Sequence, residues 1–190
     1  MQHNKPPRFL PYRTEILIVL WGLLFTKCFV FEYLVSVYSV PVNSILYIWA
    51  PSIVMATVAT LVFLRIQSEG RTAGMATSLT AGKWGGIGVA ALLILFIGLY
   101  SNLILPARIP AYFALLMGLG YGLQGARTKD LLDWLPALGW WVGGITIFQS
   151  ASVVGLLIFA VCIVLFSVLP TLLRILRGVR KGRMTSGVEK

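Results

Sequence analysis

Long apolar runs, separated by short polar segments, dominate the sequence and limit the folds open to it. A helix needs about 20 apolar residues to cross a bilayer. Because the last block is too long for one span, we expect it to break near Gln149–Ser152 into two helices. The sequence therefore predicts an all-α integral membrane protein, a six-helix transmembrane bundle. The runs cover residues 16–37, 44–64, 88–105, 111–125 and a block from 135 to 173.

Composition agrees with the membrane class. Hydrophobic residues make up 58% of the chain and charged residues 12%, whereas soluble proteins are roughly 25% charged. We divide the chain into a basic leader at 1–14, one transmembrane domain at 15–174 and a basic tail at 175–190. The first span carries charges and lacks a small-x-small cleavage site, so we interpret it as a retained helix rather than a signal peptide. The expected spans are 16–37, 44–64, 88–105, 111–125, 133–149 and 152–173.

Basic residues set the expected orientation, since the cytoplasmic loops of membrane proteins are enriched in Lys and Arg. With six spans and a cytoplasmic N-terminus, the inner segments hold fourteen basic residues and the outer segments hold only Arg108. We therefore expect both termini in the cytoplasm, a location in the plasma (inner) membrane, and contact between the basic tail and anionic lipid headgroups. Because the basic residues flank the apolar runs, the net charge of +10 does not indicate nucleic acid.

Lys27 lies near the middle of the first apolar run, and Glu32 follows five residues later. A charge at bilayer depth costs about 3 kcal/mol on insertion scales, so it is usually paired, solvated or used. One interpretation is a substrate or ion path, for which the candidates are Lys27, Glu32, Arg108 and Gln149. The other is a buried structural pair or a partly snorkelled lysine. Glu32 lies about 140° round the helix from Lys27, so a direct pair is strained. Arg108 is a candidate partner of Glu32 if the bundle brings them together, and the alternative is a carboxylate at the wet interface.

Four glycines and one proline mark expected helix contacts and a kink. Gly118 and Gly122 are four residues apart, as are Gly139 and Gly143, and this spacing lets helix backbones approach closely. Pro51 lies inside the second run, where its missing backbone donor is expected to kink the helix. A broken helix can mark a transporter site, and the alternative is a plain structural kink.

The sequence lacks the patterns of a catalytic or metal centre. His3 is the only histidine, so no Ser–His or Cys–His pair and no histidine-based metal site is expected at membrane depth. Cys28 and Cys162 lie inside apolar runs, where free cysteine behaves as a small hydrophobe. We therefore predict no metal and no cofactor, and the pattern favours a protein without enzymatic activity.

Two functions fit these features, and a third fits less well. The first is a component of small-solute or ion transport with a polar path near Lys27. The alternative is a non-catalytic subunit or assembly factor of a larger membrane complex, with a membrane-protein partner or a second copy packing on the glycine faces. An enzyme that modifies lipid has the least support, because no catalytic constellation is present.

Overall fold

A computed structural model describes the chain at residues 13–68, 108–129 and 131–177, and at ten positions between 86 and 100. All regular structure in these segments is helical, which confirms the all-α fold class. The basic leader up to residue 12, the segment 69–85 and the tail from residue 178 lie outside the described residues.

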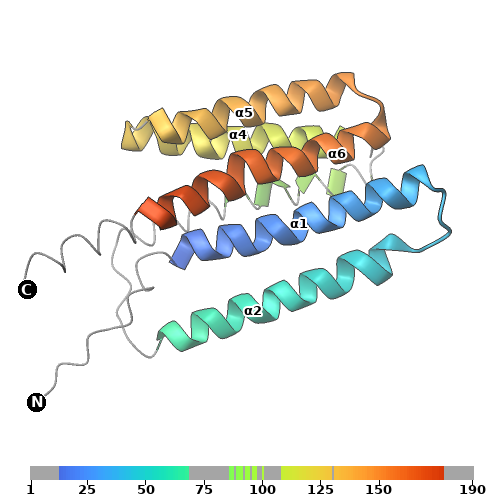
Figure 1. The fold of residues 1–190 in the computed structure, drawn as a ribbon, viewed down its shortest axis with the longest axis horizontal. Helices are drawn as coiled ribbons and strands as arrows, with labels where there is room; N and C mark the ends of the chain where they lie inside the picture. The colour runs from blue at the N-terminus through green and yellow to red at the C-terminus, as the bar shows by residue number, and fades with distance from the viewer. Residues whose placement is uncertain are drawn as a thin grey trace, which may run out of the picture.

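The helices lie side by side, and helices joined by a short connection run antiparallel (Figure 1). α4, α5 and α6 pack against one another, α1 lies against α6, and α2 lies beyond α1 at the edge. α1 begins at the end of the bundle where α6 and its continuation finish. The elements are α1 (Arg13–Val37), the π-helical turn η2 (Ile45–Trp49), α2 (Ala50–Ser68), α4 (Ile109–Thr128), α5 (Leu131–Gln149), α6 (Ser152–Ile163) and the π-helical turn η4 (Val164–Val168).

Two helices are long and apolar enough to cross a membrane by length and composition. They are Glu15–Val37 and Ser152–Arg177, and Leu46–Val62 is a shorter apolar helix. These two helices point, weakly, to membrane association. The number of spans stays a prediction.

Local sequence explains where several helices begin and end. Pro110 lies in the first turn of α4. Backbone N–H groups in a first turn have no acceptor within the helix, so the missing N–H of proline costs no hydrogen bond there. α4 ends at Lys129, which has a left-handed backbone and donates its N–H to the Gly125 carbonyl. The apolar block breaks at Ser150 and Ala151, so α5 and α6 meet in the tight turn expected from sequence.

Each π-helical turn is followed closely by a proline. η2 ends two residues before Pro51, and η4 ends two residues before Pro170. A proline ring clashes with the carbonyl four residues earlier, and a wider turn at that carbonyl relieves the clash. The chain therefore stays helical through both prolines, and α6 continues to Arg177 rather than ending at Pro170.

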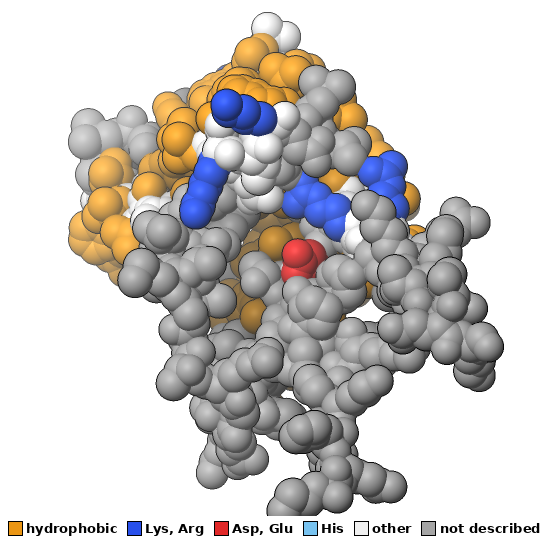
Figure 2. Space-filling view, turned by 90° about the vertical axis from the view of Figure 1, so that its left-hand side faces the viewer, with side chains coloured by type: hydrophobic (Ala, Val, Ile, Leu, Met, Phe, Trp, Pro, Cys, Tyr) orange, Lys and Arg blue, Asp and Glu red, His pale blue; other side chains and the backbone are white. Residues whose placement is uncertain are grey.

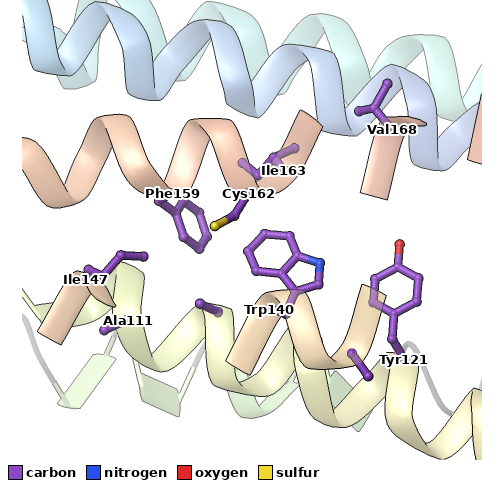
Figure 3. Close-up of a cluster of buried hydrophobic side chains, with 10 residues drawn as sticks. Ala111, Tyr121, Trp140, Ile147, Phe159, Cys162, Ile163 and Val168 are labelled. Atoms are coloured by element: carbon purple, nitrogen blue, oxygen red, sulfur yellow. The ribbon is translucent and has the colours of Figure 1, made fainter. Parts of the chain in front are cut away.

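Aromatic side chains fill the centre of the bundle between α5 and α6. Trp140 of α5 is 1% exposed and lies against Phe159 of α6, with ring centroids 5.5 Å apart. Its indole N–H donates to Ser167 Oγ at 3.2 Å. Phe159 also meets Phe29 of α1 edge to face at 4.7 Å, which links α1 to this core. Figure 3 shows Phe159 and Cys162 directed from α6 toward Trp140.

Glycines allow the close contacts between α4, α5 and α6. A Cβ at Gly118 would overlap the Trp141 indole, and Gly122 faces the same ring. On the other side of α5, a Cβ at Gly139 would overlap the Phe166 ring, and one at Gly143 would overlap Cys162 Sγ. The structure thus places all four glycines where a neighbouring helix inserts a side chain.

The α1–α2 face as a candidate functional site

Side-chain hydrogen bonds join α1 to the η2–α2 helix, and we call them the polar ladder. Trp21 Nε1 donates to Thr60 Oγ1 at 3.0 Å. Lys27 Nζ donates to Ser52 Oγ at 2.8 Å. The partners follow in opposite order along the two helices, as an antiparallel pair requires. Because these α1 side chains are six residues apart, the two rungs are about 9 Å apart along α1.

Glu32 forms the outer rung of the polar ladder. Its Oε1 accepts from Ser44 Oγ at 3.1 Å, and its Oε2 accepts from Trp49 Nε1 at 3.2 Å. Each carboxylate oxygen therefore has a donor from the start of the second helical segment. The Trp49 ring also packs edge to face on Phe29, with centroids 5.0 Å apart. Glu32 thus fixes η2 against α1.

Lys27 differs from Glu32 in what surrounds its charge. The residue is exposed, and its ammonium group donates to the neutral Ser52 hydroxyl. The structure describes two acidic side chains, Glu15 and Glu32, and neither forms an ion pair with Lys27. An ammonium group has three donors, and the charge itself is not compensated within the described residues.

An open groove of about 440 Å³ runs along α1 beside Lys27, and we call it the Lys27 groove. Its walls are mainly apolar, and Lys27 supplies the charged group. Phe31 and Leu34 continue along α1 from Lys27, Tyr38 follows directly after the end of α1, and Tyr47 and Ile48 of η2 form the other wall. The groove is therefore a strip of apolar surface with one ammonium group at its inner end.

The groove and the Trp21 and Glu32 rungs of the polar ladder lie on different sides of α1, and Lys27 belongs to both. Trp21 and Glu32 are eleven residues apart, about 20° round the helix, and both face α2. Lys27 is about 120° from Trp21, so it reaches Ser52 from the flank of the α1–α2 contact. One side of α1 holds α2, and the neighbouring side forms the groove.

Arg108 and Gln149 lie away from this face. Arg108 precedes α4, and its guanidinium donates through Nη1 to the Phe148 carbonyl near the end of α5. It also lies 5.9 Å from the centroid of the Phe148 ring. Gln149 is exposed at the end of α5. The structure brings Lys27 and Glu32 to α1–α2, and it places Arg108 at the α4–α5 end with no ion pair to Glu32.

The opposite end of the bundle carries most of the described positive charge. Figure 2 looks at this end and shows Lys and Arg side chains gathered round an apolar body. The elements that finish there carry Arg127, Lys129, Arg174 and Arg177. This is the end that the sequence places in the cytoplasm.

The pairing residues were not identified from sequence. Ser52, Ser44 and Trp49 supply the partners of Lys27 and Glu32. Ser52 stands next to Pro51 in an apolar run, and a hydroxyl there is the one signal that marks it. A run of apolar residues does not fix the register of its helix against a neighbour, so the pairs could not be read from it.

The α1–α2 face thus offers an ammonium group beside an apolar groove. Such a group can pair with a carboxylate or a phosphate. Lys27 Nζ and Ser52 Oγ lie 2.8 Å apart, and we treat the face as a candidate binding site because the groove opens beside this ammonium group. No family model matches the sequence, no curated protein matches it, and no solved structure matches its fold.

Proposed function

We propose that the protein is a six-span integral membrane protein of the plasma (inner) membrane and a non-catalytic subunit of a larger membrane complex. Two helices with the length and hydropathy of spans support the membrane location. The positions of the other described helices within the apolar runs support the count of six. The basic end of the bundle supports cytoplasmic termini.

The observation that carries the proposal is the exposed ammonium of Lys27. A charged side chain at membrane depth normally faces the bundle interior or a partner. Lys27 instead opens onto an apolar groove and meets a neutral hydroxyl. A second polypeptide on this face supplies the missing counter-charge and covers the groove.

The position of α2 supports the same conclusion. Between residues 50 and 62, only Ser52 and Ala56 are buried. The remaining side chains of that stretch include several large exposed apolar groups, among them Met55 and Leu61. A helix attached along one narrow face leaves much of its surface for lipid or for a partner.

The test is the mass of the intact assembly. The full chain, tagged and extracted from its own membranes in mild detergent, is expected to carry a second polypeptide in a fixed ratio. Native mass spectrometry measures that ratio directly. A stable, monodisperse monomer that carries no second chain would contradict the proposal.

Small-solute or ion transport is the second candidate, favoured by the size of the Lys27 groove. A volume of about 440 Å³ lies in the range of small-molecule sites, roughly 300–1,000 Å³. In this function Lys27 would line the path, whereas Glu32 faces α2 and Arg108 and Gln149 lie at the α4–α5 end, away from the groove. Flux into vesicles containing the purified chain tests it. A Lys27→Ala variant with wild-type flux would remove Lys27 from the path.

A further inference from the structure

We propose that the Lys27 groove receives a transmembrane helix of a different polypeptide, and that this helix places an Asp or Glu carboxylate against the Lys27 ammonium. The inference rests on the proposed function, because it names the face and the chemistry of that partner. Charge, shape and depth each support it.

Charge complementarity identifies the partner group. Lys27 donates one hydrogen bond to Ser52 and has two further N–H donors. Glu32, the one described acid near it in sequence, already accepts from Ser44 and Trp49. A carboxylate from outside would therefore make charge-assisted bonds that no described residue makes, and these are the stronger class of hydrogen bond.

The shape of the groove fits a helix. On α1, Lys27, Phe31 and Leu34 follow one another at intervals of four and three residues. This is the spacing of a seam into which a neighbouring helix packs its side chains. From Lys27 to Leu34 the seam runs about 10 Å along α1, and Tyr38 extends the groove past the helix end. Tyr47 and Ile48 give it a second wall.

Depth favours a carboxylate on a helix over a lipid phosphate. Lys27 is fourteen residues after Arg13 and ten before Val37, so it lies about 21 Å and 15 Å from the two ends of α1. Lipid phosphates lie outside a hydrocarbon core about 30 Å thick. A transmembrane helix can carry an acidic side chain to the middle of that core, where such residues pair with one another.

A second copy of this chain is a poorer occupant. The chain has six acidic residues, and two fall inside an expected span: Glu32, and Asp133 at the first position of the span 133–149. Asp133 therefore lies at the end of its span and not at the depth of Lys27. Glu32 would have to leave both of its donors to reach Lys27 of another copy. The partner helix therefore belongs to another polypeptide.

The experiment couples Lys27 chemically to whatever carboxylate it touches. Native membranes containing the full chain are treated with dicyclohexylcarbodiimide, which enters the bilayer. The carbodiimide activates a carboxyl group, the neutral Lys27 amine attacks it, and an amide forms while the reagent leaves as the urea. Mass spectrometry of the digested complex is expected to find Lys27 joined to an Asp or Glu in an apolar helix of a second polypeptide.

Variants give an independent readout. Lys27→Met is expected to lower the amount of that polypeptide per copy of the chain about tenfold, the effect of roughly 1.4 kcal/mol. Lys27→Arg keeps the positive charge and is expected to retain the second polypeptide in its wild-type amount. Lys129→Met, at the exposed end of α4, is the matched control and is expected to change nothing. If Lys27→Arg still copurifies the second polypeptide, and Lys27→Met is produced in wild-type amounts, then neither substitution acts by unfolding the chain.

The outcomes separate the two proposals. A second polypeptide that copurifies equally with Lys27→Met, without a Lys27 amide, leaves the subunit function standing and overturns the groove. The absence of any second polypeptide overturns both. An amide between two copies of this chain, or loss of a bound phospholipid alone in Lys27→Met, identifies a different occupant and also overturns the inference.

Discussion

The two sides of the bundle are held together by different means. In α4, α5 and α6, glycines sit opposite Trp141, Phe166 and Cys162, and the contacts are close and apolar. At the other edge, α2 is attached to α1 by a ladder of hydrogen bonds and buries few of its own side chains. In the proposed bilayer, apolar burial gives little drive between helices, so packing and hydrogen bonds must supply it. The first side is filled, whereas the second leaves the flank of α1 open.

The largest loss of stability is expected from removing a buried side chain between α4, α5 and α6. Trp140→Ala removes a fully buried ring and its bond to Ser167. We expect a loss of about 3 kcal/mol in the free energy of unfolding, the low end of values for soluble cores, because the unfolded helices remain in lipid. Equilibrium unfolding in mixed detergent measures it. Trp140→Phe keeps most of the volume and should lose less, and equal losses would contradict the packing account.

Adding volume to the contacts between α4, α5 and α6 is expected to lower the free energy of unfolding somewhat less. Gly139→Ala places a methyl group in the space of the Phe166 ring, and overpacking of this kind costs about 1–3 kcal/mol. Gly86→Ala is the control, because nothing lies within 4 Å of a Cβ there. The same unfolding assay compares them. Adding Phe166→Leu to Gly139→Ala should recover part of the loss, and no recovery would place the strain elsewhere.

Removing the outer rung of the ladder should release α2 while the rest of the bundle stays folded. Glu32→Gln replaces two charge-assisted acceptors with one neutral oxygen, at an expected cost of about 1 kcal/mol. Hydrogen exchange should rise in residues 44–68 and stay unchanged in α5 and α6. Glu15→Gln, near the start of α1, is the matched control. Faster exchange throughout the bundle would show that the two sides are one unit.

The innermost rung should give the smallest effect. Trp21→Phe and Thr60→Val each break the bond between the indole and the Thr60 hydroxyl. Side-chain hydrogen bonds between membrane helices average about 0.6 kcal/mol in double-mutant cycles. A cycle on this pair should return a coupling of that size. A coupling energy near zero would mean that the Trp21–Thr60 bond does not help to hold α2, and that only the Lys27 and Glu32 bonds of the polar ladder do.

The positions of the helices could largely be predicted from the sequence. The apolar runs at 16–37 and 111–125 match α1 and α4 to within three residues at each end, and the turn near Ser150 separates α5 from α6. Length and hydropathy suffice to place these helices, because a helix makes its backbone hydrogen bonds within its own segment and needs no partner for them. The π-helical turns before Pro51 and Pro170 could not be predicted in detail, since a proline can be accommodated by a kink, a break or a wider turn.

The partners in the candidate site could not be predicted, because they depend on how helices are rotated against one another. Lys27 was recognisable as an unusual charge, but Ser52 as its partner was not. Arg108 was a candidate partner of Glu32, and it binds the Phe148 carbonyl instead. Trp140 and Trp141 were not recognised as packing residues from the sequence, and in the structure Trp140 packs on Phe159 and Trp141 on Gly118.

In the proposed complex, a partner helix covers the groove side of α1 and leaves the outer side of α4 to lipid. Photo-cross-linking residues placed at Leu34, in the groove, and at Leu119, exposed on α4, test this in native membranes. The account predicts that Leu34 captures the same polypeptide that forms an amide with Lys27, and that Leu119 captures lipid alone. Capture of that polypeptide at Leu119 and not at Leu34 would contradict it.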